Sequence, residues 1–289
     1  MMRKMNNFTV VLLFILLSSC RSPDVQFIPP LILEAEGLSF PEGPVFAGDK
    51  LLFSNCYGMW IGRLYENGRL DTFANLSAMD FKPNGLYWSE NDELWACEYN
   101  KGRILKLNNR GEVIKIFDNH GERFSRPNDM TFHKGLIYFT DPKSYSKDVL
   151  DGKIYILDPA KEEIKLFADN LAFPNGLSVS PDGQELIVCE SAKNRVISLS
   201  MTDPDDREII VNLPGGDPDG IEFNSKGILF VAHFGGGKVY TADIEKKALL
   251  DSLELPGKRV TNIVFNHDES KLFITEAEQN KIYSIGLKR

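Results

Sequence analysis

Six short segments of the sequence resemble one another, and their repetition decides the fold. They are PEGPVF (41–46), PNGLYW (83–88), PNDMTF (127–132), PNGLSV (174–179), PDGIEF (218–223) and TNIVF (261–265). Each has one polar residue ahead of a short apolar run, and we call these residues the anchors: Glu42, Asn84, Asn128, Asn175, Asp219 and Asn262. Successive anchors are 42, 44, 47, 44 and 43 residues apart. A fixed period of about 40–45 residues in β-rich units is typical of a β-propeller.

Each period has the patterning for four strands. A polar turn follows the anchor segment and leads to a second apolar run: LLFSN, LWACE, LIYFT, LIVCE, ILFVAH or KLFITE. A third run follows, such as RILKL (103–107), and a fourth, such as EVIKIFD (112–118), completes the unit. We therefore predict an all-β fold, a six-bladed β-propeller of four-stranded blades over residues 31–289. Two β-sandwiches would have no reason to keep six equal periods.

The ends of the repeat predict how the ring closes. The last unit ends at Arg289 after its third strand, whereas residues 31–35 precede the first anchor and belong to no unit. We expect this N-terminal segment to supply the missing outer strand, because that pairing leaves the ring without an open edge.

The first residues are typical of an export signal. Arg3 and Lys4 precede an apolar run over residues 8–17, which is too short to span a bilayer comfortably. Leu17–Cys20 (LSSC) resembles the lipobox of bacterial lipoproteins, and the resemblance implies cleavage before Cys20 and lipidation of that residue. We expect a lipoprotein signal peptide over 1–19 and a lipid-anchored tether over 20–30. The protein would then be an exported, membrane-anchored bacterial lipoprotein on the periplasmic or cell-surface side. The alternative is an ordinary secretory signal with a chance cysteine.

The charge balance bears on the partners. The sequence has 33 Lys+Arg against 41 Asp+Glu, a net charge of −8. Removal of residues 1–19 takes away two basic residues and leaves 31 against 41, or −10. This balance argues against a nucleic-acid partner, which usually requires a basic face. We expect a small-molecule substrate and a membrane contact through the lipid, and the sequence gives no indication of oligomeric state.

The anchors are candidates for a metal site. In a propeller the loops that lead into the innermost strands share one face, so the six anchors should converge near the axis. Glu42, Asn175 and Asp219 are a donor set suited to a hard cation, with Asn84 and Asn128 as further candidates. Oxygen-only ligands favour Ca²⁺, with Mg²⁺, Mn²⁺ or Zn²⁺ as alternatives. PNG, PND and PDG are also common turn sequences. However, six buried polar groups need an ion or water as a partner.

Other polar residues should reach the same face at the ends of the second strands. They are Glu98, Asp141, Glu190, His233 and Glu276. We favour a structural role for the acids, and for His233 we leave open a substrate contact or an inter-blade hydrogen bond. Cys56, Cys97 and Cys189 occupy matching positions of their units, which predicts packing residues with free thiols.

Several of these motifs resemble one family. PEGPVF, RPNDM-x8-FTDP (126–142), FPNGLSVSPDG (173–183) and DPDGIEF (217–223) occur in the order found in the gluconolactonase/regucalcin/luciferin-regenerating-enzyme family. The resemblance covers about residues 36–289 and implies a six-bladed propeller with one central divalent cation. It implies Glu42, Asn175 and Asp219 as metal ligands, and Arg126, Asn128 and Asp129 as the substrate-binding motif. Asn84 replaces the histidine found at that anchor in the more distant paraoxonases, so aryl-ester or phosphotriester activity is not expected.

The resemblance implies a metal-dependent hydrolase that opens a sugar lactone or a similar lactone. The cation would stabilise the negative charge on the carbonyl oxygen while water attacks, and Asp219 or a water on the metal would remove the proton. Asp219 is thus both metal ligand and candidate catalytic residue. The alternative is a non-catalytic propeller that binds a ligand or protein and keeps a structural calcium. A strictosidine-synthase-like lyase shares the architecture but would not need the metal set.

Overall fold

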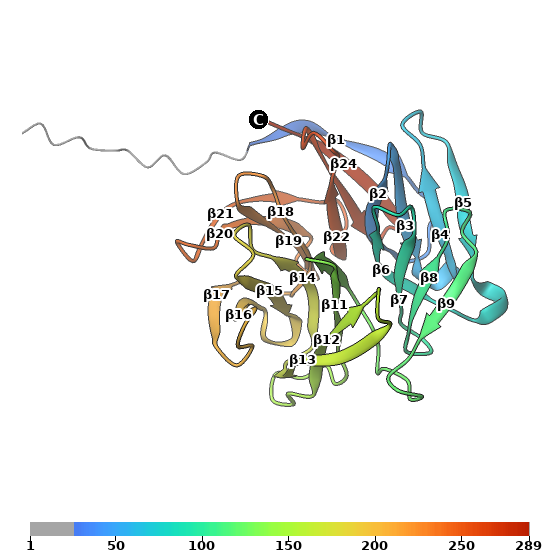
Figure 1. Cartoon of the computed structure of the whole chain (residues 1–289). Helices are drawn as coiled ribbons and strands as arrows, with labels where there is room; N and C mark the ends of the chain where they lie inside the picture. The colour runs from blue at the N-terminus through green and yellow to red at the C-terminus, as the bar shows by residue number, and fades with distance from the viewer. Residues whose placement is uncertain (1–25, 289) are drawn as a thin grey trace, which may run out of the picture.

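In the computed structural model, which describes residues 26–288, the chain forms six four-stranded antiparallel sheets around a central axis (Figure 1). Blade 1 is β2 (Pro41–Ala47), β3 (Lys50–Asn55), β4 (Trp60–Leu64) and β5 (Leu70–Asn75). Blade 2 is β6 (Pro83–Trp88), β7 (Leu94–Glu98), β8 (Arg103–Leu107) and β9 (Val113–Phe117). Blade 3 is β10 (Met130–His133), β11 (Leu136–Asp141), β12 (Gly152–Asp158) and β13 (Glu163–Leu171).

The second half of the chain repeats the pattern. Blade 4 is β14 (Pro174–Val179), β15 (Glu185–Glu190), β16 (Arg195–Ser200) and β17 (Arg207–Asn212). Blade 5 is β18 (Asp217–Phe223), β19 (Ile228–Phe234), β20 (Lys238–Asp243) and β21 (Ala248–Glu254). Blade 6 is β22 (Val260–Phe265), β23 (Lys271–Glu276), β24 (Lys281–Leu287) and β1 (Phe27–Ala35). Short 3₁₀ turns η1 (Cys56–Gly58), η2 (Ser77–Met79) and η3 (Ser191–Lys193) lie in the connections. The predicted six-bladed propeller is confirmed.

Blade 6 closes the ring in the predicted way. Its strand order is β22–β23–β24–β1, so the N-terminal strand pairs antiparallel with the C-terminal one at the outer edge of the blade. The two strands lie side by side in Figure 1. β1 begins at Phe27, four residues before the expected start at residue 31, so residues 27–30 form part of the blade.

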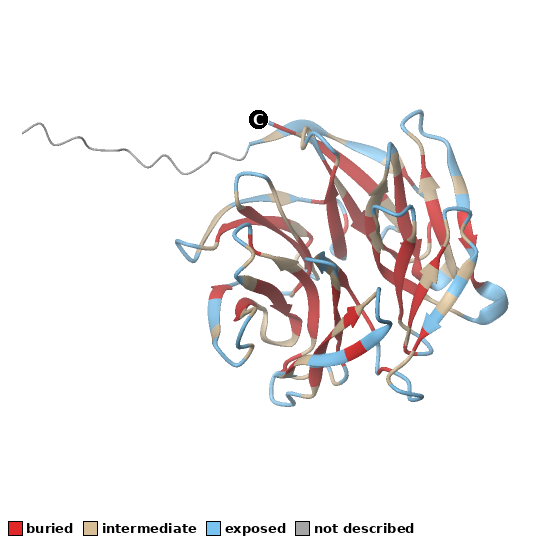
Figure 2. Cartoon of the chain, viewed as in Figure 1, coloured by how far each residue is buried: buried red, intermediate tan, exposed pale blue. Residues whose placement is uncertain are grey.

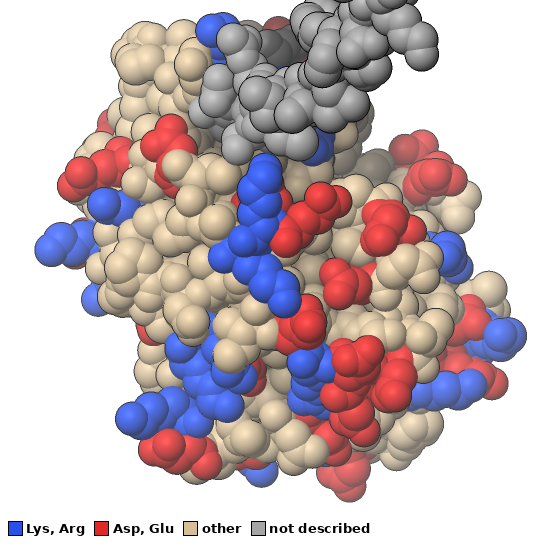
Figure 3. Space-filling view, turned by 90° about the vertical axis from the view of Figure 1, so that its left-hand side faces the viewer, with Lys and Arg blue, Asp and Glu red and all other residues tan. Residues whose placement is uncertain are grey.

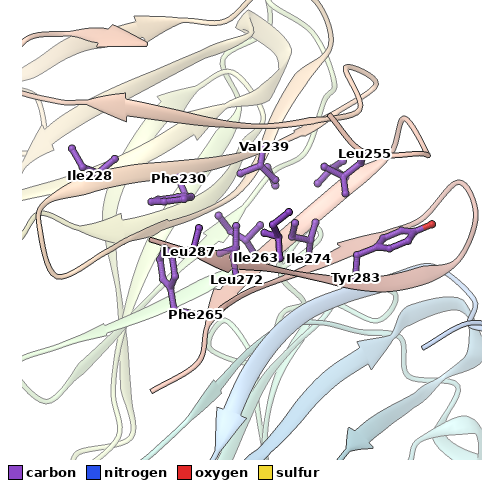
Figure 4. Packing of buried hydrophobic residues seen from close by; sticks show 13 residues of the cluster. Ile228, Phe230, Val239, Leu255, Ile263, Phe265, Leu272, Ile274, Tyr283 and Leu287 are labelled. Carbon is purple, nitrogen blue, oxygen red and sulfur yellow. The ribbon is translucent and has the colours of Figure 1, made fainter. Parts of the chain in front are cut away.

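The hydrophobic core consists of six clusters, each between two neighbouring blades. The cluster between blades 5 and 6 packs Phe230 and Val239 against Ile263, Ile274 and their neighbours (Figure 4). Figure 2 shows burial concentrated on the inner strands, while the outer strands and turns are more exposed. The second strands are buried on both faces, which explains their nearly continuous apolar sequences.

The three cysteines of the described range are buried and free, as predicted. Cys97 packs between blades 2 and 3, and Cys189 between blades 4 and 5. Burial raises the pKa of Cys56 to about 12, so its thiol stays protonated.

Two predictions concern residues beyond this range. The signal peptide (1–19) and the lipidated Cys20 lie outside the described residues, as does the tether (20–30) up to residue 25. Within residues 26–288, no helix is long and apolar enough to cross a membrane. Basic and acidic side chains are interspersed on the face that Figure 3 shows.

Candidate active site at the axis

The anchors lie where the innermost strands are irregular. The pairing of first and second strands shifts register close to the anchor in five blades: between Glu42 and Val45, Pro83 and Leu86, Pro174 and Leu177, Pro218 and Ile221, and Val260 and Asn262. In blade 3 the regular strand begins only at Met130, after Asn128. Bulges bend a strand and redirect a side chain, and they are common beside functional sites. Here they accompany anchors that face the axis.

A glycine follows the anchor in four blades because neighbouring inner strands approach closely. A Cβ on Gly43 would lie 2.2 Å from the carbonyl oxygen of Asn84, and one on Gly176 would lie 2.2 Å from that of Asp219. Gly85 is crowded in the same way by Asp129, with 2.6 Å to its Cα. PNG and PDG therefore lie within strands here, and the interpretation as turns is wrong for these segments.

Five anchors line one cavity of about 220 Å³ on the axis. They come from five different blades: Glu42, Asn84, Asn128, Asn175 and Asp219. Each is at most 8% exposed. The predicted convergence is therefore observed, and it places two carboxyl and three amide groups around one volume.

The remaining anchor, Asn262, does not line this cavity and instead pairs with a residue across the axis. Asn262 of blade 6 donates through Nδ2 to Oδ2 of Asp129, in blade 3 on the opposite side of the ring, at 3.2 Å. Asp129 also accepts at Oδ1 from the Met130 N–H at 2.9 Å. Asp129 was predicted to bind substrate. In the structure it is buried in this cross-axis pair and does not line the cavity.

Three carboxyl groups share the buried centre and oppose one another's ionisation. Burial, followed by the charge of Asp129, raises the pKa of Glu42 to about 8. Burial also raises the pKa of Asp219 well above its ordinary value, with Glu42 and Asp129 as the next causes. Burial raises the pKa of Asp129 to about 6. A positive charge among these groups would reverse the trend and hold them ionised.

The donor set fits a hard divalent cation. Within residues 26–288, no group of three or more His, Cys, Asp or Glu residues is arranged for a metal, so a cation here would depend on amide oxygens as well as carboxylates. Asn84 Oδ1 is buried and has no hydrogen-bond partner in the described part of the chain. A buried oxygen without a partner is costly unless something positive faces it. Glu42, Asn175 and Asp219, with Oδ1 of Asn84, therefore fit a divalent cation in charge and in donor chemistry.

Arg126, the other predicted substrate contact, lies at the rim. Its side chain is exposed and does not line the cavity, and its guanidinium is 5.9 Å from the ring centroid of Tyr99, which does. Lys82 holds the matching position of blade 2, with its Nζ 5.3 Å from the ring of Tyr57. Both cations thus lie against aromatic rings that line the cavity, and neither cation lines the cavity itself.

The strand-end acids hold the loops in place. Glu98 accepts the N–H groups of Lys82, Asn100 and Lys101, at 2.7–2.9 Å. Asp141, Glu190 and Glu276 likewise accept backbone N–H groups from the segment that leads into the inner strand of their own blade. The favoured structural role is observed. The bonds are made within each blade, and none of these four acids lines the cavity.

His233 is fully buried, and its Nε2 lies 3.1 Å from Oδ1 of Asn194 in blade 4. This is the inter-blade hydrogen bond that the sequence left open. Because an amide oxygen only accepts, Nε2 carries the proton, and Nδ1 has no partner among the described residues. Burial lowers the pKa of His233 to about 4.

Sequence reasoning missed the walls of the cavity, which are aromatic. They are formed by Phe40, Tyr57, Tyr99, Tyr145, Phe173 and Phe234. Phe40 and Phe173 precede the anchor prolines of blades 1 and 4, so the repeat offered a signal: matching positions of two units carry the same large apolar residue.

Comparison with known proteins agrees with this architecture. The profile of the SMP-30/gluconolactonase/LRE-like region matches residues 40–278. A gluconolactonase of Zymomonas mobilis subsp. mobilis is 27% identical over 282 residues, covering 85% of this chain and 78% of its own length. The solved gluconolactonase of Xanthomonas campestris superimposes with a TM-score of 0.79 at 25% identity, with 89% of each chain covered. The regucalcin of Agrobacterium tumefaciens, a calcium-binding protein, shares the fold with a TM-score of 0.72 at 18% identity, with 89% of this chain and 93% of that chain covered. From its repeat, its fold and these matches, the chain belongs to the SMP-30/gluconolactonase/LRE-like family.

Proposed function

We propose that this protein is a divalent-metal-dependent hydrolase that opens a lactone in the axial cavity. The observation that carries the proposal is the convergence of five oxygen-bearing anchors from five blades on one cavity. Membership of a family that contains gluconolactonases supports lactone opening as the reaction. A sugar lactone or a similar lactone is the substrate class that the family favours.

Glu42, Asn175 and Asp219 would hold the cation, with Oδ1 of Asn84 as a further donor. Two carboxylates balance a double positive charge, and oxygen donors favour Ca²⁺ among the candidate ions. A bound divalent cation supplies Lewis-acid polarisation of a carbonyl group and stabilises negative charge on its oxygen.

In the reaction, water adds to the lactone carbonyl carbon and the bond from that carbon to the ring oxygen breaks. One proton of the water leaves during the attack and one proton reaches the ring oxygen, so the product is a hydroxy acid. Asp219 is the group best suited to accept the first proton at a carboxylate oxygen. Burial and the neighbouring carboxylates make it more basic, which offsets part of the opposing effect of a bound cation.

Asn128 lines the cavity and can orient substrate hydroxyl or carbonyl groups through its amide. Arg126, at the rim, is placed to act on a substrate that reaches out of the cavity. Asp129 supports the floor through Asn262, so its expected contribution is to position the neighbouring anchors.

The test is lactone hydrolysis by residues 21–289 after EDTA treatment and after addition of Ca²⁺, Mg²⁺, Mn²⁺ or Zn²⁺. We expect turnover that depends on the metal, and Asp219→Ala is expected to lose both metal binding and turnover. Glu90→Gln, in the exposed turn between β6 and β7, is a control outside the cavity and should retain turnover. Full turnover by metal-loaded Asp219→Ala would reject its catalytic role. A folded protein that binds metal but opens no lactone would favour the non-catalytic binding propeller.

We also propose that Cys20 is lipidated after removal of residues 1–19 and that the protein is exported and membrane-anchored. The proposal depends on the lipobox-like LSSC sequence alone. When the full chain is expressed in a bacterium that is fed labelled fatty acid, the protein should become labelled. It should also partition into the detergent phase when the cells are extracted with detergent. Cys20→Ala should abolish both effects, and an unlabelled, water-soluble wild type would contradict the proposal.

A further inference from the structure

The cavity has two aromatic walls that face each other. The blades follow one another around the axis in chain order, and each core cluster joins neighbours, so blades 1 and 4 lie opposite each other. Phe40 precedes β2 of blade 1, and Phe173 precedes β14 of blade 4. Both line the cavity. The anchors Glu42 and Asn175 follow two residues later in the chain. The aromatic ring and the oxygen donor at each position are therefore placed by the same strand, β2 or β14.

Each wall contains more than one ring. The Phe40 wall includes Tyr57, with ring centroids 4.7 Å apart, and Phe234, at 6.3 Å from Phe40. The Phe173 wall includes Tyr145, at 5.1 Å and an interplanar angle of 75°. These ring contacts make each wall a continuous apolar surface.

The backbone holds the two leading phenylalanines in an uncommon conformation. Phe40 has φ of 59° and Phe173 has φ of 55°. Residues with large side chains rarely adopt such φ values, because the conformation costs free energy. Residues held in such conformations are often found at ligand sites. The Phe40 carbonyl accepts the Cys56 N–H and the Phe173 carbonyl accepts the Ser191 N–H, and the Lys82 carbonyl accepts the matching Tyr99 N–H in blade 2. The bond is thus general to the repeat, whereas the positive φ is what the two opposite blades share at the residue that presents a ring to the cavity.

Tyr145 extends one wall over the cavity. It belongs to the connection between β11 and β12, in the unit with the longest anchor spacing, and its hydroxyl donates to Oδ1 of Asp217 at 2.5 Å. Asp217 immediately precedes the anchor proline of blade 5, in the position that Phe40 and Phe173 hold in their blades. The hydrogen bond therefore fixes a ring from blade 3 beside the blade 4 wall.

The charges of the cavity disfavour an anionic ligand. Glu42, Asp217 and Asp219 line it, and among residues 26–288 no lysine or arginine does. A divalent cation would balance two of these carboxylates and leave the third. Three cations lie against wall rings and do not line the cavity themselves: Lys82 at Tyr57, Arg126 at Tyr99 and Arg259 at Phe234, each 5.3–5.9 Å from the ring centroid.

We propose that this cavity takes a neutral lactone whose ring carries a flat apolar substituent, in preference to a polyhydroxylated or anionic sugar lactone. This inference rests on the proposed function and specifies its substrate class. The oxygen-rich floor receives the lactone carbonyl, and the substituent lies between the Phe40 and Phe173 walls. A volume of about 220 Å³ lies below the usual range of ligand pockets, about 300–1,000 Å³, so it suits a ligand of only one or two rings.

The first experiment compares lactones that share one ring. Values of kcat/KM are measured for δ-gluconolactone, δ-valerolactone, 6-phenyl-δ-valerolactone and 6-(4-carboxyphenyl)-δ-valerolactone. We expect the phenyl compound to exceed both δ-gluconolactone and the carboxyphenyl compound by about tenfold or more. If δ-gluconolactone is the best substrate, the inference is overturned while the proposed function stands.

The second experiment measures binding without turnover. Calorimetry with the Ca²⁺-loaded protein compares the corresponding lactams, 6-phenylpiperidin-2-one and piperidin-2-one, which are far more resistant to hydrolysis. The phenyl lactam should bind about tenfold more tightly. If no lactone is opened, the proposed function fails, but tighter binding of the phenyl lactam would still support the inference about the ligand class. Equal affinity for the two lactams overturns the inference.

Variants locate the effect. Phe173→Leu keeps an apolar side chain without branching at Cβ, and it should reduce kcat/KM for the phenyl lactone about tenfold with little change for δ-valerolactone. Phe132→Leu is the control, because Phe132 stacks on Tyr87 away from the cavity. Equal losses on both substrates in Phe173→Leu, or a similar loss in the control, would reject the wall as the specificity determinant.

Discussion

At the scale of single residues, the glycines after the anchors set how closely the inner strands approach. The nearest atoms to a Cβ on Gly176 would be backbone atoms of Asp219 and Gly220, at 2.2 and 2.7 Å, which cannot move aside as a flexible side chain can. Gly176→Ala should lower the free energy of unfolding by about 1–3 kcal/mol, as overpacked cores do. Urea denaturation measures the change.

Gly286→Ala is the matched control. The nearest atom to its added Cβ is a side-chain carbon of Ile28, at 3.3 Å, so only a small adjustment is required. Its urea midpoint should stay close to that of the wild type. If Gly176→Ala also unfolds at the wild-type midpoint, the inner strands are less tightly held than the distances indicate.

A second residue-scale prediction concerns His233, whose buried ring has a pKa of about 4 against 6.5 in its ordinary state. As pH falls, His233 therefore binds a proton in the unfolded chain at a higher pH than it does in the folded protein. Stability is retained above pH 6.5 and lost as pH falls toward 4. The loss attributable to this residue between pH 7 and pH 5 should be about 2 kcal/mol.

The measurement compares free energies of unfolding of the wild type and His233→Gln at both pH values, with EDTA throughout. Glutamine keeps an N–H donor for Asn194 but does not titrate, so subtraction removes the contribution of the axial carboxylates. Identical pH dependence in the two proteins would show that His233 is not the group that titrates.

The chemistry of the anchors could be predicted from their residue types, but the walls could not. Glu42, Asn175 and Asp219 stand out because oxygen donors recur at a fixed period. The direction of Phe40 and Phe173 depends on a positive φ that their residue type disfavours. The side chain of Arg126 packs toward Tyr99 through tertiary contacts, which no local pattern encodes.

At the scale of elements, β1 is the strand on which closure of the ring depends. It pairs with β24 from Phe27 to Ala35 and adds Phe27 and Leu31 to the cluster between blades 5 and 6. The sequence predicted the strand because the last unit lacks an outer one. Its true start was missed because Pro29 and Pro30 suggest a loop. The register of the β1–β24 pair shifts between Ile28 and Ile32, so the two prolines lie at an irregularity of an outer edge strand, where proline is tolerated.

Removal of β1 should destabilise the whole propeller. A chain that starts at residue 36 exposes the edge of β24 and the apolar surface under β1, so we expect a lower Tm and self-association through the open edge. A chain that starts at Gln26 keeps the strand and is the control. Thermal unfolding and size-exclusion chromatography measure both effects. A truncated chain that is monomeric and melts at the control temperature would show that closure is dispensable.

At the scale of the whole molecule, the period of the anchors determined the architecture more firmly than any single element. Six units of nearly equal length require the same sheet six times, and six inter-blade clusters follow from packing those sheets around one axis. The centre of such a ring collects one polar group from every blade. The sequence could therefore locate the site but not its depth, its floor or its walls.

A bound cation at this centre would be held by opposite blades, so its effect on stability should extend over the ring. Glu42 and Asn175 come from blades 1 and 4, and Asp219 comes from blade 5. Without a cation, burial raises the pKa of Glu42 to about 8, so the apo protein loses stability as pH rises from about 4.5 to about 8. A ligand that binds only the folded state at 100 times its Kd adds about 2.7 kcal/mol.

We therefore expect Ca²⁺ at that concentration to raise the Tm of EDTA-treated protein at pH 8 by roughly 5–10 °C. Calorimetry should still show one cooperative transition. Glu42→Gln should abolish most of the rise, and in EDTA it should be more stable than the wild type at pH 8, because the amide removes a buried carboxyl that opposes its neighbours. Glu90→Gln, in the turn between β6 and β7, is the surface control. A wild-type Tm that is the same in EDTA and in each of the four cations would mean that the anchors meet without holding a metal.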